Sequence, residues 1–272
     1  LLFAKGVILV ESDAELILIP SLIKKVLGIS LDELGVSLIS MDSAFFEHIS
    51  KLFDKERIRK NCSIITDSDS SIVALPATPS DDTPLQKSCR NSQKSGVQRK
   101  EKLDEYIKNN KYIEAFYAAH TFEVDFLLED NSIEVIQTLK SIYSQDASIQ
   151  KSTALLESKE LDVYGNEVLR LANKEGKGWF AILLAEKLSS ETYIPKYILN
   201  ALAFSCNSQL AESILYKMCL YRLNNTMPVF DDKDKPTQFF KDNITDETAC
   251  INEFLKSCPD DDLSYLINLL SR

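Results

Sequence analysis

The sequence lacks several features that would place it in a familiar class. It has no C-x-x-C pair and only two histidines, His48 and His120, so the spacing of a zinc finger is absent. Its six cysteines lie far apart, which fits reduced thiols of a cytoplasmic protein better than a disulfide framework. No stretch approaches the ~18 apolar residues of a membrane helix. The first residues carry one lysine and no small-residue cleavage site, so they resemble a strand entered mid-fold, as in a piece of a longer polypeptide, and not a signal peptide.

The chain also lacks an excess of positive charge. It has 41 acidic residues against 31 lysines and arginines, a net charge of −10, which argues against a protein that coats DNA by charge alone. An enzyme whose bound metal ions offset acidic ligands remains compatible with this balance. Hydrophobic residues make up 44% of the 272 positions, so we expect a sizeable core in one large or two ordinary domains.

The first 70 residues alternate between strand and helix patterns. Strands are predicted at "GVILVE", "GVSLISM" and "CSIITDSD", and helices at "AELILIPSLIKKVLG", with Gly28 as a stop, and "DSAFFEHISKLF", with Asp42 as an N-cap. This alternation favours parallel pairing through right-handed crossovers. In such a sheet, functional side chains collect at the carboxyl ends of the strands.

The rest of the chain divides at about residue 130. Residues 68–98 are rich in Ser, Pro, Asp and Thr, so we expect a loop, mobile over about 70–98. A helix from Arg99, a fourth strand at "IEAFYAA" and a helix start at "HTFEVDFLLE" follow it. Nearly everything after residue 130 has helical spacing without a repeat period. The sequence thus predicts an α/β domain at 1–130 and an all-helical domain at 131–272.

Acidic residues mark the ends of two predicted strands. Glu11 ends the first strand and Glu15 lies in the following helical turn, while Asp67 and Asp69 end the third strand. The i, i+2 spacing of the two aspartates points both carboxylates to one side if the chain stays extended. Like charges this close favour a bound cation, and oxygen ligands without histidine suit Mg²⁺ or Mn²⁺. Glu15 fits a helix-capping acid equally well, and Asp13 fits an N-cap better than a ligand.

Several stretches in this order resemble a known family. "ILVESDAELILIP", "VSLIS" and "IITDSD" look like a Toprim domain, the fold shared by topoisomerases, primases and some nucleases. More narrowly, "VESDAELILIPSL", "HTFEVDFLL", "GKGWFAILLAEKL" and "IPKYILNAL" are similar to the overcoming-lysogenization-defect (OLD) family of nucleases. The resemblance extends over about residues 7–203. It departs from the pattern at Ser12, where Toprim sequences usually carry glycine, and the G-x-x-x-x-G-K-[ST] motif of the family's ATPase is missing.

The resemblance implies a Toprim-type parallel sheet flanked by helices, with a centre that uses two Mg²⁺ or Mn²⁺ ions to cut DNA. The family's positions fall on Glu11 and Glu15, on Asp67 and Asp69, on Glu123 of the T-x-E pattern and on Lys177 before F-A. One ion would lie among Glu11, Glu15 and Asp67, and the second near Asp69 and Glu123. Lys177 would add positive charge during the reaction. The pattern does not rank Asp125 against Glu123.

Several residues also fit ordinary structural roles. Glu123 alone is more typical of a first-turn acid. Lys177 at a helix start is unfavourable with respect to the helix dipole, which indicates a facing anion, although a solvated lysine is the alternative. Trp179 and the apolar residues after it have the spacing of a helix core. The basic residues from Lys87 to Lys102 favour a solvated face, with a DNA-backbone contact as the alternative.

Taken together, these features predict the catalytic part of an OLD-like, ATP-dependent nuclease, and the resemblance implies a role in defence against phage. The resemblance implies an ATPase domain, normally in the same polypeptide, through which an oligomer could form. Two rivals remain open. One is another Toprim enzyme, such as a primase or topoisomerase, and the other is a metal-binding scaffold that docks an ATPase and cuts nothing.

Overall fold

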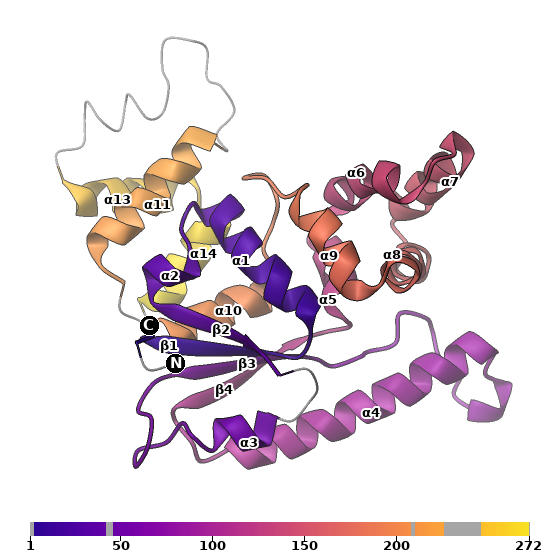
Figure 1. Ribbon diagram of the computed structural model, residues 1–272, viewed down its shortest axis with the longest axis horizontal. Coiled ribbons are helices and arrows are strands. Elements are labelled where there is room, and N and C mark those ends of the chain that lie inside the picture. The colour runs from indigo at the N-terminus through magenta and orange to yellow at the C-terminus, as the bar shows by residue number, and fades with distance from the viewer. Residues whose placement is uncertain (1–2, 42–45, 208–209, 226–245, 272) are drawn as a thin grey trace, which may run out of the picture.

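A four-stranded parallel sheet organises the chain (Figure 1). The structure is a computed structural model that describes residues 3–41, 46–207, 210–225 and 246–271. The strands are β1 (Gly6–Val10), β2 (Val36–Ser40), β3 (Cys62–Asp67) and β4 (Ile113–Ala118). They lie in the order β2-β1-β3-β4, and each adjacent pair is parallel. The predicted α/β fold with a parallel sheet is therefore confirmed.

Helix α1 (Asp13–Leu27) follows β1 directly and shows how the sequence specifies the local structure. Its apolar side chains recur at helical spacing and are buried, and it ends at Gly28, whose φ of 72° favours glycine. Ser12, not Asp13, is the N-cap, so the predicted cap is wrong by one residue. Ser12 forms a capping box with Glu15, the geometry in which a Ser and a Glu three residues later satisfy each other.

Each face of the sheet has its own hydrophobic core. Ile8 and Val10 of β1 pack in the larger core with α1 and α10 (Lys196–Ser205), while Val7 and Leu9 pack in a smaller core beside Phe46 of α3 (Phe46–Ser50) and Leu103 of α4 (Pro84–Ile107). Alternate strand residues point to opposite faces, so both faces must be covered.

Helix α10, from the carboxyl-terminal half of the chain, is tightly packed on the sheet. A Cβ atom at Gly6 would lie 1.9 Å from the backbone oxygen of Ser205, and the Ser205 hydroxyl donates to the carbonyl of Val7 at 2.9 Å. The Ser63 hydroxyl donates to the carbonyl of Ala201 at 2.6 Å. The two halves thus share the larger core, and the division into domains at residue 130 stays a prediction.

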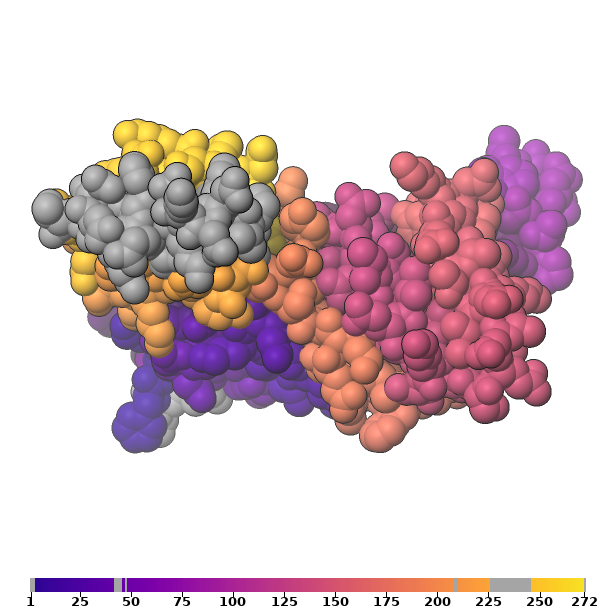
Figure 2. Space-filling view, turned by 90° about the horizontal axis from the view of Figure 1, so that it is seen from above, coloured from indigo at the N-terminus to yellow at the C-terminus, as the bar shows by residue number. Residues whose placement is uncertain are grey.

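The remaining elements are helical. They are α2 (Leu31–Leu34), α5 (Phe122–Leu128), α6 (Ser132–Ile142), α7 (Asp146–Leu156), α8 (Leu161–Glu175), α9 (Lys177–Ala185), α11 (Glu212–Asn225), α13 (Glu247–Ser257), α14 (Asp262–Leu270) and a 3₁₀ turn at Pro79–Asp81. In Figure 2, α6–α8 lie at one end of the long axis and α11, α13 and α14 at the other. The described residues after 130 contain no strand, as predicted. No helix in the described ranges is long and apolar enough to cross a membrane.

Helix α4 contradicts the predicted loop at about 70–98. It begins at Pro84, so 15 of those residues belong to a 24-residue helix, where the sequence predicted a helix only from Arg99. Thr83 and Gln86 form its capping box, and proline is favoured in the first turn. Only Gly96 and Leu103 of this helix are buried, so the sequence shows no apolar periodicity. The predicted N-cap Asp42 lies outside the described residues.

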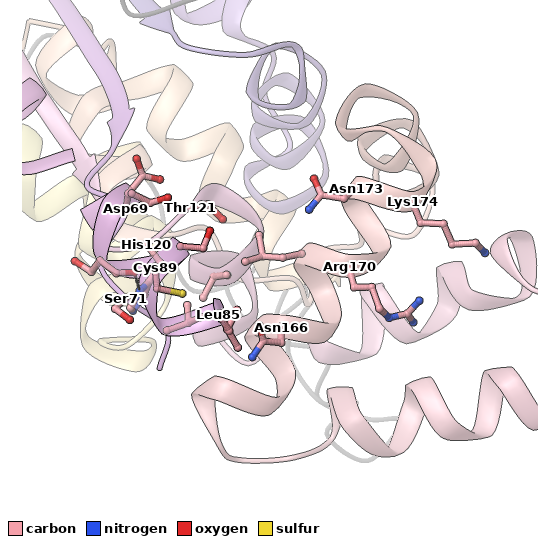
Figure 3. Close-up of a pocket in the computed structure, with 16 residues that line it drawn as sticks. Asp69, Ser71, Leu85, Cys89, His120, Thr121, Asn166, Arg170, Asn173 and Lys174 are labelled. Atoms are coloured by element: carbon pink, nitrogen blue, oxygen red, sulfur yellow. Dashed lines mark hydrogen bonds between the residues drawn. The ribbon is translucent and has the colours of Figure 1, made fainter. Parts of the chain in front are cut away.

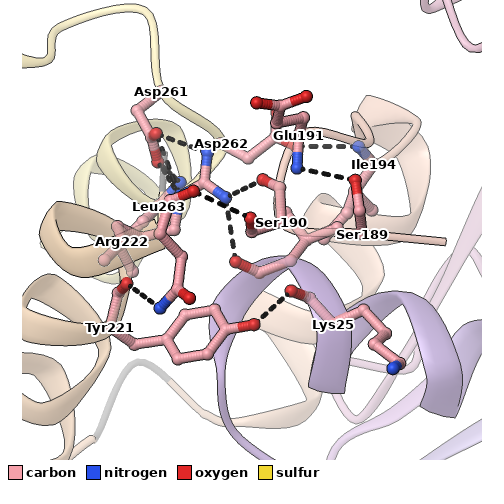
Figure 4. Close-up of polar contacts among 12 residues, drawn as sticks. Lys25, Ser189, Ser190, Glu191, Ile194, Tyr221, Arg222, Asp261, Asp262 and Leu263 are labelled. Atoms are coloured by element: carbon pink, nitrogen blue, oxygen red, sulfur yellow. Dashed lines mark hydrogen bonds and ion pairs between the residues drawn. The ribbon is translucent and has the colours of Figure 1, made fainter. Parts of the chain in front are cut away.

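A buried arginine joins three of the outer elements (Figure 4). Arg222 of α11 pairs with Asp261 at the start of α14, with Nη2 2.6 Å from Oδ2. Its Nη1 donates to the carbonyls of Val26, in α1, and Ser190, at 2.9 and 2.5 Å. The guanidinium is buried and donates to each of these acceptors, so it holds the carboxyl-terminal helices against α1.

Candidate active site

The carboxyl ends of β1 and β3 meet at one edge of the sheet. Val10 pairs with Ile65, so the residues that follow each strand are neighbours. Thr66 donates its hydroxyl proton to Oε2 of Glu11 at 2.6 Å, which fixes the Glu11 carboxylate beside the tip of β3. The sequence predicted this meeting of two strand ends, and it follows from the parallel pairing.

Glu15 lies just inside α1 and is 2% exposed. The backbone N–H of Ser12 donates to its Oε2 at 3.0 Å, and the Ser12 hydroxyl contacts the same oxygen. Burial raises the pKa of Glu15, and the nearby carboxylates of Glu123 and Glu11 raise it further, against the lowering effect of the Ser12 hydrogen bond. Glu15 is therefore both a capping acid and a member of a carboxylate cluster, and the two roles are compatible.

Asp67, the last residue of β3, lies at the centre of this cluster. Burial raises its pKa well above the usual range, and the carboxylates of Glu15, Glu123 and Glu11 add to the increase. Lys177 acts in the opposite direction. Four acids and one lysine from separate parts of the chain thus lie within electrostatic range of one another. We define these residues as the carboxylate cluster: Glu11, Glu15, Asp67, Glu123 and Lys177.

Glu123 and Lys177 form an ion pair between two helix starts. Nζ of Lys177 lies 3.4 Å from Oε1 of Glu123, whose side chain is 3% exposed. Burial lowers the pKa of Lys177, but Glu123, Asp67 and Glu15 outweigh this effect and hold it above the usual value. Lys177 therefore faces an anion, as its unfavourable position relative to the helix dipole indicated. The Oε2 atom of Glu123 is buried and has no hydrogen-bond partner among the described residues.

Asp69 does not lie as the extended D-x-D pattern predicted. Strand β3 ends at Asp67, and Asp69 has a left-handed φ of 52°. The prediction assumed that side chains alternate along an extended chain, and this alternation stops before Asp69. Its Oδ2 is 2.5 Å from Nη2 of Arg99, in α4. Asp69 also borders a cavity of about 750 Å³, in which Thr121 lies on the same side and Asn166 and Asn173 of α8 lie opposite (Figure 3).

Asp125 has a structural contact that distinguishes it from Glu123. Both of its oxygens accept backbone N–H groups, from Ala119 at 2.5 Å and His120 at 3.0 Å, which closes the turn between β4 and α5. Each bond uses one of the two lone pairs of its oxygen and holds the carboxylate against this turn. Glu123 differs in that its Oε2 has no hydrogen-bond partner among the described residues.

The cluster has the chemistry of a site for hard cations. Its ligand atoms are carboxylate oxygens, which Mg²⁺ and Mn²⁺ prefer, and the unpartnered Oε2 of Glu123 is a buried acceptor that a cation would satisfy. Within the described ranges, no three acidic, histidine or cysteine side chains are grouped closely enough to hold a metal as they stand. Several of the acids instead contact a protein group, such as Thr66 for Glu11 and Lys177 for Glu123. Binding would require these side chains to turn.

Tyr197 was missed by the sequence analysis. It is the second residue of α10, and its hydroxyl is buried without a hydrogen-bond partner in the described part of the chain. Burial raises its pKa, and the carboxylates of Asp67 and Glu15 contribute. A tyrosine in an apolar helix gives no signal in the sequence, because only the packing of α10 on the sheet brings it to the cluster.

Comparisons with known proteins bear on the family and the fold of the chain. Residues 2–69 match the family described as "Overcoming lysogenization defect protein-like, TOPRIM domain". The fold is similar to the C-terminal region of the Burkholderia pseudomallei OLD protein, at 26% identity and a TM-score of 0.55, over 76% of this chain and 98% of that one. The C-terminal region of the Xanthomonas campestris pv. campestris OLD protein gives 26% identity and 0.54, over 76% and 97%. No curated protein sequence matches the chain. Residues 2–69 are therefore an OLD-like Toprim domain, in a chain that folds like the C-terminal regions of OLD proteins.

Proposed function

We propose that this chain is a metal-dependent DNA endonuclease that hydrolyses phosphodiester bonds with two Mg²⁺ or Mn²⁺ ions. The observation that carries the proposal is the convergence of four acids and Lys177 at the carboxyl edge of an OLD-like Toprim sheet, where burial and repulsion raise the pKa of Asp67. Lys177 offsets only part of the negative charge of this group, and buried like charges destabilise a protein, so a cationic ligand best accounts for their presence.

The residues of the cluster would have different tasks. Glu11, Glu15, Asp67 and Glu123 would hold the ions, and Asp69 would join them only if its ion pair with Arg99 opens. When bound, the ions would lower the pKa of a water molecule and neutralise charge on the scissile phosphate. Lys177 would hold its ammonium group beside that phosphate and offset the negative charge that develops there.

The proposal extends to the context of the chain. By its similarity to OLD C-terminal regions, we expect an ATPase domain, normally in the same polypeptide, with any oligomer forming through that part, and a cytoplasmic role in defence against phage. One observation favours a non-catalytic scaffold instead, because Glu11, Glu15 and Glu123 already have protein partners.

Nicking of supercoiled plasmid distinguishes these functions. The unchanged chain should nick with Mg²⁺ or Mn²⁺ and not with EDTA, whereas Asp67→Asn and Glu123→Gln should nick at least about 100-fold more slowly, since each removes one ligand charge. Asp13→Asn is the matched control, because Asp13 is an exposed acid in the first turn of α1. Equal cutting by all four proteins would contradict the site, and no cutting by any of them would favour the scaffold.

A further inference from the structure

Tyr197 of α10 has a buried hydroxyl that the fold leaves unsatisfied. Its oxygen has no hydrogen-bond partner among the described residues, while its ring packs against the larger core. An unsatisfied buried hydroxyl lowers the stability of a protein, and phenylalanine would fill nearly the same space without this cost. Packing therefore explains the ring of Tyr197 but not its hydroxyl.

Helix α10 runs antiparallel to the strands that it covers. Near its end, the carbonyl of Phe204 accepts from Nδ2 of Asn61, just before β3, at 2.7 Å. Earlier in the helix, the carbonyl of Ala201 accepts from the hydroxyl of Ser63, the second residue of β3, at 2.6 Å. The start of α10 therefore lies toward the carboxyl end of β3, where the strand ends at Asp67.

Tyr197 lies on the side of α10 that meets the sheet. Ala201 and Ser205, which contact β3 and β1, follow it at intervals of four residues, the spacing of one helix face. Tyr197 is about 6 Å along the helix from Ala201, a distance that spans about two residues of a strand. Because helical side chains tilt toward the start of their helix, its hydroxyl extends further, toward Asp67.

The side chain of Asp67 points to the same face of the sheet. Side chains alternate along β3, and on this face Ser63 contacts α10 while Ile65 belongs to the larger core. Asp67 is the next member of this series and still pairs with β4, so its carboxylate extends toward the side of α10. Burial raises the pKa of Tyr197, and the carboxylates of Asp67 and Glu15 lie near enough to raise it further. The hydroxyl and the Asp67 carboxylate thus converge from the helix and the strand.

We propose that Tyr197 is a positioning residue, whose hydroxyl donates a hydrogen bond to the Asp67 carboxylate when that carboxylate binds a metal ion. Each carboxylate oxygen has two lone pairs, so Asp67 can accept from Tyr197 and bind a cation at the same time. Hydrogen bonds of this kind fix the orientation of a metal-binding carboxylate and strengthen the site. The inference deepens the proposed function and rests on it for the presence of the ion.

Tyr197→Phe tests the inference in the full chain, because it keeps the ring and removes only the hydroxyl. In EDTA, its melting temperature should equal or exceed that of the unchanged chain, since an unsatisfied polar group is lost. Its dissociation constant for Mn²⁺ should be about 10- to 100-fold larger, as measured without DNA by electron paramagnetic resonance of the free ion. A purely structural role predicts the opposite pair of results, a lower melting temperature and an unchanged affinity for Mn²⁺.

Tyr193→Phe is the matched control, because it removes the hydroxyl of a tyrosine that lies just before α10 and is 49% exposed. It should leave both quantities unchanged. Full Mn²⁺ affinity or a lower melting temperature of Tyr197→Phe, or an equal loss of affinity in Tyr193→Phe, would each overturn the inference. Mn²⁺ binding by the unchanged chain without plasmid nicking would contradict only the nuclease, and nicking with full affinity of Tyr197→Phe only the positioning. An unchanged chain that binds no Mn²⁺ would contradict both.

Discussion

Nζ of Lys177 lies 3.4 Å from Oε1 of Glu123, so a lysine at the start of α9 faces a buried glutamate at the start of α5. The second oxygen of Glu123 has no hydrogen-bond partner in the described ranges of the chain. A buried carboxylate is costly unless it is paired, and this one is only half satisfied. The pair therefore neutralises part of the cluster and leaves one acceptor for a ligand.

Replacing Lys177 tests its part in the reaction. We expect Lys177→Met to lower the rate of plasmid nicking by about 100- to 1000-fold, the loss typical of one group that stabilises developing charge. The variant should also be less stable, because Glu123 loses its counter-charge, and adding Glu123→Gln should restore stability without restoring nicking. Plasmid nicking and urea unfolding measure the two effects. Lys140→Met, at an exposed position of α6, is the control. If Lys140→Met nicked plasmid as slowly as Lys177→Met, the role assigned to Lys177 would be contradicted.

Asp67 should couple metal binding to stability. Asp67→Asn keeps the shape of the side chain and removes a charge that Glu15, Glu123 and Glu11 repel. In EDTA we expect its melting temperature to equal or exceed that of the unchanged chain. Mn²⁺ at 100 times its dissociation constant should raise the free energy of unfolding of the unchanged chain by about 2.7 kcal/mol. The same Mn²⁺ concentration should stabilise the variant clearly less. Equal Mn²⁺ shifts in thermal melts of both proteins would rule out Asp67 as a ligand, and Asp13→Asn is the matched comparison.

The stability of the carboxyl-terminal helices should depend on pH through Asp262 (Figure 4). Burial raises the pKa of this carboxyl from 3.8 to about 6, against the lowering effect of the hydrogen bond from the Ile194 N–H. Well below pH 3.8 both folded and unfolded chains hold the proton, so the raised pKa then has no effect on stability. Between pH 4 and 6 the unfolded state loses its proton first, and the free energy of unfolding falls by a total of about 2 to 3 kcal/mol.

Asp262→Asn should remove this dependence, because asparagine still accepts from Ile194 and carries no charge. The variant should therefore gain stability relative to the unchanged chain as the pH rises from 4 to 6, and keep a constant advantage above pH 6. Urea unfolding across this range measures the difference. Asp260→Asn controls for the loss of one exposed charge. A constant difference between Asp262→Asn and the unchanged chain from pH 4 to 7 would disprove the assignment.

Gly96 should determine how α4 meets the end of β3. A Cβ atom there would lie 2.2 Å from the backbone oxygen of Ser68, next to Asp67 and Asp69, and a backbone atom cannot yield as a side chain can. We expect Gly96→Ala to lower stability and to slow nicking by shifting Asp69 and Arg99. Gly165→Ala, in α8, is the matched control, since its Cβ would make ordinary 3.5 Å contacts with Ile72 and alanine favours a helix by up to about 1 kcal/mol. Similar melting temperatures for the two variants would contradict this.

Local patterns were sufficient for the sheet and most helices. The apolar run before Glu11 predicted β1 because every residue of this strand is buried. Gly28 predicted the end of α1 because the helix ends in a left-handed φ that favours glycine. The pattern failed where a helix has little buried surface, as in α4 before Arg99. It also failed at Trp179, whose side chain is 55% exposed, since apolar spacing cannot show whether a neighbouring helix covers a given side chain.

The sequence by itself determined the strand ends at which Glu11 and Asp67 stand, since the alternation of strand and helix favours a parallel sheet and a parallel sheet brings its carboxyl ends to one edge. The family resemblance added Glu123 and Lys177, but only the tertiary structure decided which further groups reach that edge and how they pair. Tyr197 comes from a distant helix, and the turn after Asp67 directs Asp69 to Arg99. These placements depend on helix packing and on one left-handed residue, which sequence spacing does not encode.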